Sequence, residues 1–294
     1  MISTKRILLT GASGQVGFEL QRQLCLHGDI EAPTSQQLDL ADQAAVENWL
    51  NERKPDLIVN AAAYTAVDKA EDEADRARRL NAELPAQLAA YCAEQGACLV
   101  HYSSDYVYPG NGNTAWSETS TSGPLSTYGQ TKLEGDQAIM ASGCQHWIFR
   151  TSWVYSARGN NFMKTMLRLG REREALSIVA DQVGAPTPAR LIAQVTAMGL
   201  SREIPSGLYH LAPRGETSWH GFAEAIFQMA KARGEALAID QAQLAGIPTT
   251  DYPTPATRPL NSRLDLTKLE KTLQVKLPDW QSQLALTLAE YLEP

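Results

Sequence analysis

The sequence predicts an α/β protein with a Rossmann-type, doubly wound parallel sheet and a smaller C-terminal lobe. Short apolar segments alternate with longer amphipathic ones through the first half of the chain, as in strands joined by right-handed crossover helices. The first apolar segment, at residues 6–10, leads directly into a run that contains Gly11, Gly14 and Gly17. A glycine-rich turn between a strand and a helix is the setting of a dinucleotide phosphate site.

The composition is that of a soluble globular protein. The chain has 294 residues, 44% hydrophobic and 20% charged, which is enough for a large core or for two interlocked domains. A net charge of −7 argues against general binding to nucleic acid or to membrane surfaces. No apolar run reaches the ~18 residues that span a bilayer, and no signal peptide is recognisable, so we expect a cytoplasmic protein. The four cysteines form no CxxC pair, and we expect reduced thiols.

The first half of the chain supplies the expected elements in order. A helix is expected at residues 18–26, a second at 44–53, a third at 70–95 with an interruption near Pro85, and a fourth after Ser126. Further strands are expected at 55–60, 97–102 and 147–150. The carboxyl ends of parallel strands lie at one edge of a sheet, where ligands bind. The residues that follow these strands should therefore converge, and they are Gly11, Ala61 to Ala63, Ser104 and Thr151.

Beyond residue 155 the alternation becomes less regular. We expect a helix at 160–173, a turn at 182–188 before another helix, a late strand at 207–211, and an irregular proline-rich segment at 249–259. We therefore assign residues 1–155 to a dinucleotide-binding domain. Residues 156–294 would form a mainly substrate-binding lobe that is interleaved with late strands of the sheet.

The glycine turn has GxxGxxG spacing. The first glycine permits a tight turn, the second lets backbone approach a pyrophosphate, and the third lets the helix pack on the strand. The phosphates would then meet free N–H groups at the helix N-terminus. Three alanines, Ala61 to Ala63, follow the strand at 55–60 and leave room for a flat ligand, although a tightly packed strand end explains them as well.

A second motif is Tyr128-x-x-x-Lys132, which follows Ser126 and Thr127, either of which is able to cap a helix. In a helix the two side chains lie at i and i+4 on one face. A phenol titrates near ~10, and an adjacent ammonium lowers its pKa. Such a pair gives a proton to a carbonyl oxygen or takes one from an alcohol. The alternative is a surface tyrosine that rests on a lysine stem.

Ser104, Tyr128 and Lys132, together with the glycine turn, resemble the Ser/Thr-Tyr-Lys triad of the short-chain dehydrogenase/reductase superfamily. Longer blocks resemble the dTDP-4-dehydrorhamnose reductase family within it, and they lie at residues 60–70, 101–110, 149–155, 181–187 and 252–259. The resemblance covers nearly the whole chain. It implies an oxidoreductase that reduces dTDP-4-dehydro-6-deoxy-L-mannose to dTDP-L-rhamnose with NADPH or NADH, for surface polysaccharide such as the O-antigen of lipopolysaccharide.

The resemblance also implies roles for single residues. Tyr128 would protonate the C4 carbonyl, Lys132 would lower the pKa of Tyr128 and hold the nicotinamide ribose, and Ser104 would bind the substrate oxygen. Asp105 and Trp153 match substrate-contacting positions, although Trp153 is also compatible with core packing. The cofactor would be bound by Gly11, Gly14, Gln15, Val16, Gly17, Asp39, Leu40, Ala62, Ala63, Tyr64, Thr65, Tyr102, Tyr128 and Lys132.

Two features depart from the expected patterns. NAD-binding Rossmann units usually carry an acid after the second strand, whereas residues 32–35 here read Ala-Pro-Thr-Ser, with neither an acid nor an arginine. We therefore expect both NADPH and NADH to serve. Some relatives dimerise through Mg²⁺ held by glutamates; Glu19 matches one ligand, but Arg190 stands where another carboxylate is expected. Because arginine only donates hydrogen bonds, we expect no metal site and a monomer or weak homodimer.

Two alternatives remain open at this point. A nucleotide-sugar epimerase or dehydratase also carries YxxxK but retains NAD⁺, and a dehydratase usually has extra carboxylates beside the triad serine. Here Asp105 and Tyr106 follow Ser104, and no glutamate does. The other alternative is a non-catalytic regulatory subunit related to this family, which binds methionine adenosyltransferase. The intact Ser104, Tyr128 and Lys132 disfavour that interpretation.

Overall fold

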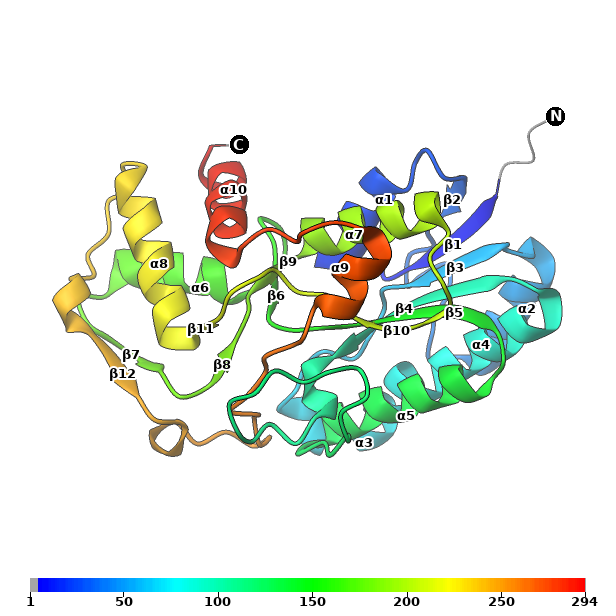
Figure 1. Cartoon of the computed structure of the whole chain (residues 1–294), viewed down its shortest axis with the longest axis horizontal. Helices are drawn as coiled ribbons and strands as arrows, with labels where there is room; N and C mark the ends of the chain where they lie inside the picture. Colours follow the sequence, from blue (N-terminus) through cyan, green and yellow to red (C-terminus); the bar gives the residue numbers. More distant parts are fainter. Residues whose placement is uncertain (1–4, 294) are drawn as a thin grey trace.

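The centre of the fold is a parallel sheet of six strands in the order β10-β5-β4-β3-β1-β2 (Figure 1), in a computed structural model that describes residues 5–293. The strands are β1 (Arg6–Thr10), β2 (Asp29–Glu31), β3 (Leu57–Asn60), β4 (Cys98–Ser104), β5 (Gln145–Thr151) and β10 (Gly207–His210). The chain reverses direction across the sheet after β2, so β1 and β3 are neighbours. The predicted doubly wound sheet is confirmed.

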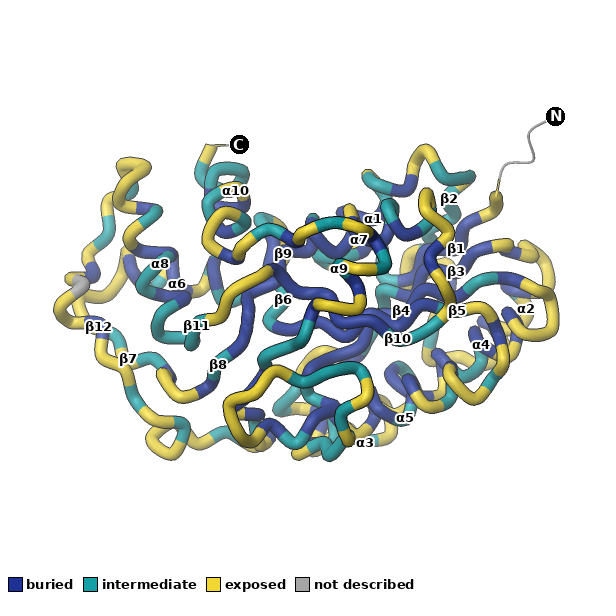
Figure 2. The backbone as a smooth tube through the Cα atoms, in the orientation of Figure 1, coloured by how far each residue is buried: buried dark blue, intermediate teal, exposed yellow. Residues whose placement is uncertain are grey.

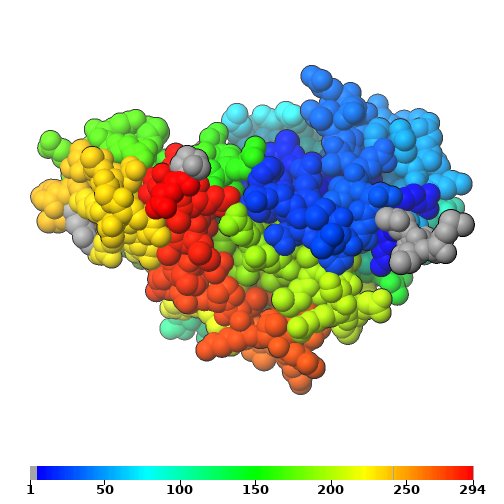
Figure 3. Space-filling view, turned by 90° about the horizontal axis from the view of Figure 1, so that it is seen from above, coloured from blue at the N-terminus to red at the C-terminus, as the bar shows by residue number. Residues whose placement is uncertain are grey.

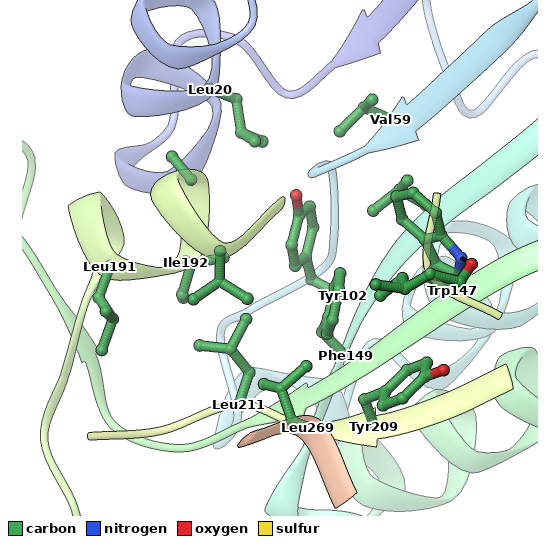
Figure 4. Packing of buried hydrophobic residues seen from close by; sticks show 14 of the residues in the cluster. Leu20, Val59, Tyr102, Trp147, Phe149, Leu191, Ile192, Tyr209, Leu211 and Leu269 are labelled. Atoms are coloured by element: carbon green, nitrogen blue, oxygen red, sulfur yellow. Dashed lines mark hydrogen bonds between the residues drawn. The ribbon is translucent and has the colours of Figure 1, made fainter. Parts of the chain in front are cut away.

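Helices cover both faces of the sheet because alternate residues of each strand point to opposite sides. Ile7 and Leu9 of β1 pack in one core and Leu8 packs in the other. On the first face lie α1 (Gln15–Gln23), α7 (Ala189–Arg202) and α9 (Thr267–Leu273), and Figure 4 shows this core around Tyr102, Phe149 and Ile192. On the second face lie α2 (Gln43–Arg53), α4 (Leu84–Gln95) and α5 (Thr127–Ala141).

The expected helix at residues 70–95 is divided, as predicted, near its proline. A short 3₁₀ turn, η1 (Lys69–Glu71), and α3 (Ala74–Arg78) lead into a π-helical turn, η2 (Arg79–Glu83), and α4 begins after it. Pro85 lies at the second position of α4, which directly follows the π-helical turn. π-helical turns are frequent at functional sites, and this one packs beside α5.

The second lobe has its own core. It contains α6 (Phe162–Glu172), α8 (Trp219–Ala232) and α10 (Trp280–Leu292), with the parallel pair β7 (Leu176–Val179) and β12 (Leu244–Ile247). The expected turn at 182–188 holds two short strands: β8 (Val183–Gly184) pairs with β11 (Thr217–Ser218), and β9 (Thr187–Pro188) with β6 (Val154–Tyr155). In Figure 3, α10 lies between α8 and the N-terminal segments around α1.

Several boundaries differ from those expected. The helix α1 ends at Gln23 rather than near residue 26, and Leu26, an apolar residue that suggested continuation, is 93% exposed. The strand β4 extends to Ser104, so the triad serine is its last residue. Figure 2 shows that the central strands are buried along most of their length and that exposure is concentrated in the outer turns. Among residues 5–293, no helix is both long enough and apolar enough to cross a bilayer.

Candidate active site

The carboxyl edge of the sheet brings together the residues expected there. Thr10, Asn60 and His101 are neighbours in register across β1, β3 and β4, and Ser104 pairs with Thr151 of β5. Gly11 and Ala61 follow the first two of these strands directly. The glycine turn, the alanine segment and the triad serine therefore share one edge, as the alternation of elements predicted.

The glycine turn is tight and leaves no space for side chains. Gly11 adopts φ of +68°, and a Cβ on it would lie 2.6 Å from Ala62 N. The Gly14 N–H donates to Gly11 O at 2.9 Å, which closes the turn. A Cβ on Gly17 would lie 2.1 Å from Gly11 O, so the third glycine is required by the turn itself rather than by the packing of the helix on the strand. The N-terminus of α1 therefore faces this edge with free N–H groups, an arrangement that fits a dinucleotide pyrophosphate.

The helix α5 presents Tyr128 and Lys132 to the end of β4. Its N-terminus is capped by Ser126, whose Oγ accepts a hydrogen bond from Gly129 N at 3.2 Å, as the sequence predicted. Gly129 and Gly135 allow close packing, because a Cβ would lie 2.3 Å from Tyr106 O at the first and 2.2 Å from Asn81 O at the second. These contacts fix the height and rotation of α5 against the site.

Ser104 and Tyr128 are the candidate reactive residues at this edge. The Ser104 hydroxyl donates to Asp105 Oδ1 at 3.1 Å and accepts from Tyr106 N at 3.2 Å in η3 (Asp105–Val107). Burial raises the pKa of the Tyr128 phenol to about 12, although a hydrogen bond with Ser104 lowers it. The Tyr106 ring stands edge-on to Tyr128 at 5.4 Å. Tyr128 is therefore a neutral acid near pH 7.

Lys132 is 1% exposed and faces the end of β4. Its Nζ donates to Tyr102 O at 2.7 Å and lies 3.3 Å from His101 Nε2. Burial lowers the pKa of Lys132 to about 8, and the Asp136 carboxylate, one helical turn further, opposes that shift. The prediction that Lys132 lowers the pKa of Tyr128 stays a prediction: in the chain alone burial of the phenol has the larger effect, and the ammonium is directed to β4.

The segment after β3 is held by a residue that sequence reasoning missed. Asn81 in η2 is fully buried; its Oδ1 accepts from Tyr64 N at 2.9 Å and its Nδ2 donates to Tyr64 O at 3.1 Å. Tyr64 also donates its hydroxyl to Glu73 at 3.0 Å. Ala62 and Ala63 are partly exposed and Thr65 is exposed. The segment thus presents small side chains and backbone toward the edge, consistent with a flat ligand.

The remaining residues expected to bind the cofactor differ in burial and in the elements that carry them. Gln15 and Val16 open α1, and Gln15 Oε1 accepts from Asn161 Nδ2 of the second lobe at 2.8 Å. Asp39 is exposed and Leu40 partly buried, in the segment that precedes α2. The Tyr102 ring packs in the first core (Figure 4), with its hydroxyl 2.8 Å from Thr196 Oγ1. The structure therefore offers the Tyr102 backbone, rather than its ring, to this edge.

On the other side of the triad lies the second lobe. Trp153 has a positive φ of 49°, which is strained for a bulky residue, and it stacks on Trp219 with 3.8 Å between ring centroids. Trp219 also lines a cavity of about 500 Å³ with Phe162, Tyr252 and Arg258. Trp153 is only half-buried, so its stacking with Trp219 leaves part of its surface available at the site.

Two ion pairs link distant segments around the site. Arg258 Nη2 lies 2.7 Å from Asp68 Oδ2, which ties the proline-rich segment to the loop after β3. Beneath the triad, Arg150 Nε lies 2.9 Å from Asp136 Oδ2, and both side chains are nearly inaccessible. Arg150 also donates to the Tyr108 hydroxyl at 2.8 Å.

Glu19 and Arg190, which were expected at the position of a shared metal, lie close together. Glu19 is buried in α1, and Arg190 Nη2 lies 3.6 Å from its Oε1. Arg190 also pairs with Glu290 of α10. Among residues 5–293, no group of three or more His, Cys, Asp or Glu side chains is arranged to hold a metal ion.

Comparisons with known proteins show the family to which the chain belongs. Residues 5–293 match the family described as RmlD substrate binding domain. The chain is 48% identical to a dTDP-4-dehydrorhamnose reductase of Shigella flexneri and 47% identical to one of Escherichia coli K12, in each case over 283 residues that cover 94% of both chains. A Bacillus anthracis dTDP-4-dehydrorhamnose reductase, solved in complex with NADP, superposes with a TM-score of 0.91 at 33% identity over 98% of this chain and all of that one.

Proposed function

This chain belongs to the dTDP-4-dehydrorhamnose reductase family, and on that premise we propose that it reduces dTDP-4-dehydro-6-deoxy-L-mannose to dTDP-L-rhamnose with NADPH or NADH. The similarity extends over nearly the full length of the named relatives. The observation that carries the proposal is the convergence of Ser104, Tyr128 and Lys132 with the glycine turn at one edge of the sheet.

The residues present fit a reduced nicotinamide dinucleotide. The cradle formed by Gly11 and Gly17 would be filled by any Cβ, and the free N–H groups of α1 attract phosphates. When bound, the cofactor supplies the hydride that reduces a carbonyl carbon. Lys132, with its ammonium at the end of β4, would hold the nicotinamide ribose. Gln15 and Val16 would lie at the pyrophosphate, Asp39 and Leu40 at the adenosine, and Ala62, Ala63, Tyr64, Thr65 and Tyr102 beside the ribose and nicotinamide.

Tyr128 would donate the proton that the reduced C4 oxygen requires. Since burial raises the pKa of its phenol to about 12, Tyr128 keeps this proton at neutral pH until negative charge develops on the substrate oxygen. Ser104 would hydrogen-bond that oxygen and fix its direction. Asp105, beside Ser104, and Trp153, stacked on Trp219 of the second lobe, would contact the sugar.

A charged pair at the end of β2 bears on the choice between the two cofactors. Glu31, the last residue of β2, lies 3.4 Å from Arg53 through its carboxylate, and the uncharged segment 32–35 follows it. A carboxylate engaged by arginine is a weak repellent of a 2′-phosphate, and no charged side chain of residues 32–35 favours either cofactor. We further propose a cytoplasmic enzyme, monomeric or weakly dimeric, that binds a nucleotide sugar and neither nucleic acid nor membrane. Its product would serve surface polysaccharide.

The test is a coupled assay with the 4-keto sugar, in which the absorbance of NADPH or NADH is followed for the parent chain and for Tyr128→Phe. The substitution removes one hydroxyl and keeps the ring, so turnover should fall ~10²–10⁴-fold while NADPH still binds. Tyr209→Phe is a matched control, because Tyr209 donates its hydroxyl to Pro205 O at 2.7 Å away from the site. Turnover of Tyr128→Phe within a few-fold of the parent would refute the role of Tyr128. A parent that leaves the keto sugar unreduced would refute the proposed function.

A further inference from the structure

The ammonium of Lys132 has two hydrogen-bond partners within residues 5–293, and both are neutral. One is the Tyr102 carbonyl oxygen at 2.7 Å and the other is His101 Nε2 at 3.3 Å. The carboxylate of Asp136 lies one turn along α5, but Arg150 holds it at 2.9 Å. A lysine carries three donors and no acceptor when charged. The imidazole of His101 is thus a direct partner of the ammonium rather than a distant neighbour.

His101 belongs to a buried chain of polar groups that crosses three adjacent strands. Its Nδ1 lies 3.1 Å from Asn60 Nδ2 on β3, and Thr10 Oγ1 on β1 donates to Asn60 Oδ1 at 2.6 Å. This series of hydrogen-bonded polar groups ends where Ala62 N donates to Thr10 Oγ1 at 3.3 Å, beside the glycine turn. Thr10, Asn60 and His101 are each at most 1% exposed. The chain therefore connects Lys132 with the other end of the candidate cofactor site through the interior of the sheet.

The donor and acceptor pattern of this chain is restricted. A charged Lys132 only donates, so His101 Nε2 must accept and the proton of a neutral imidazole must lie on Nδ1. This pattern requires the Asn60 amide to be rotated by half a turn from the orientation given above, so that its oxygen accepts from Nδ1 and its amide group donates to Thr10 Oγ1. A neutral Lys132 both donates and accepts, so it would allow the reverse pattern as well. The orientation of Asn60 and the tautomer of His101 are therefore linked to the charge on Lys132.

We propose that His101 is a positioning residue for Lys132, which holds the ammonium at the end of β4 by accepting its hydrogen bond, and that Asn60 and Thr10 fix the imidazole tautomer that allows this. The expected effect of His101 on the pH profile of kcat rests on the function proposed above. The titratable and charged groups around Lys132 are His101 on β4, Tyr128 and Asp136 on α5, and Arg150 on β5. A histidine that merely fills the core would affect stability and leave the titration of Lys132 unchanged.

The experiment compares His101→Leu and His101→Gln in the full chain. NADPH affinity is measured by the fluorescence of bound NADPH between pH 6 and 10, together with the pH profile of kcat. Loss of an acceptor for a charged donor disfavours the ammonium, so the basic limb of both profiles should move down by about one pH unit in His101→Leu. In His101→Gln the carbonyl oxygen of glutamine is able to accept from Lys132 Nζ. The basic limb of this variant should therefore move by less than about half a pH unit from that of the parent. His210→Gln is the burial-matched control, because His210 is also inaccessible but lies 2.6 Å from the Tyr108 hydroxyl instead of beside Lys132.

Each outcome decides the inference. A folded His101→Leu with the parent's basic limb overturns it, whatever its thermal stability. If His101→Leu does not fold, Asn60→Ala replaces it: the loss of the amide frees the tautomer, a shift in the same direction supports the inference, and an unmoved limb overturns it. If the parent binds NADPH but does not reduce the keto sugar, the proposed function fails while the binding limb still decides the role of His101.

Discussion

Asp105 is a buried carboxylate that should reduce the stability of the fold. It lies directly after Ser104 and is 2% exposed. Burial raises the pKa of Asp105 from 3.8 to about 6, although the Ser104 hydroxyl, which donates to its Oδ1 at 3.1 Å, lowers it. Its Oδ2 meets no hydrogen-bond partner among the described residues. We predict that Asp105→Asn is more stable than the parent at pH 8 and less active.

The magnitude follows from the raised pKa. A folded-state pKa above the unfolded value adds stability below pH 3.8, and this contribution is lost as pH rises through about 6. The difference of about 2 pKa units, at ~1.4 kcal/mol each, sets an upper limit of about 3 kcal/mol above pH 7. Asparagine keeps an oxygen for Ser104 but adds two amide hydrogens that need acceptors. We therefore expect a gain of about 1–2 kcal/mol, or a rise in Tm of about 2–6 °C.

Thermal unfolding of parent and variant between pH 4.5 and 8 measures this effect. The advantage of Asp105→Asn should be small at pH 4.5 and fully developed at pH 8. Asp265→Asn is the matched control, because hydrogen bonds with Thr267 lower the pKa of Asp265, so that its loss should lower Tm at pH 8. If Asp105→Asn is less stable than the parent at pH 8, or if its advantage is independent of pH, the charge on buried Asp105 does not reduce the free energy of unfolding, and the argument is wrong.

Three further predictions concern the pair beneath the triad, the glycine turn and the cofactor. Arg150→Met should cost about 3–5 kcal/mol and lower Tm by about 6–12 °C, because Asp136 is left buried without its partner; Arg168→Met, which breaks an exposed pair, should cost under about 1 kcal/mol in the same melting experiment. Gly17→Ala should abolish NADPH binding in a fluorescence titration, because its Cβ would overlap Gly11 O, and unchanged affinity would contradict the geometry of the turn. Finally, kcat/KM for NADPH and NADH should differ by less than about a hundredfold (roughly 2.7 kcal/mol). A ratio of several thousand would contradict this prediction and would show that a charged side chain recognises the ribose 2′-position.

The sheet and the triad motif were predictable because their patterns are local. Apolar runs of a few residues followed by helical spacing locate the strands along the chain, and the position i+4 places Lys132 one turn from Tyr128 whatever packs around them. The end of β4 at Ser104 was less predictable, because the polar sequence after Tyr102 resembles a loop until it pairs with β5. Strand ends depend on partners that are distant in sequence.

The supporting residues were missed for the same reason. Asn81 acts on Tyr64 from a π-helical turn, and His101 meets Asn60 across a separation of 41 residues. Nothing local distinguishes either one from a polar residue on the surface. The raised pKa of Tyr128 was not foreseen, because i,i+4 spacing gives proximity but not the direction of the ammonium or the depth of burial, and here burial has the larger effect.

The last prediction concerns Arg190 and divalent metals. Glu19, whose side chain is 4% exposed, lies 3.6 Å from Arg190 Nη2, and Arg190 also pairs with Glu290. The guanidinium thus already supplies the positive charge between these carboxylates, and an arginine repels a cation instead of ligating it. Mg²⁺ and EDTA should therefore change neither the sedimentation coefficient nor the turnover. Arg190→Gln should lose about 1–2 kcal/mol, since the buried Glu19 carboxylate then lacks its cation while Glu290 keeps Arg22 at 4.0 Å, and added Mg²⁺ should restore part of its Tm. A parental dimer that EDTA dissociates would contradict this argument, whereas a dimer unaffected by EDTA would contradict the expected monomer and leave the role of Arg190 intact.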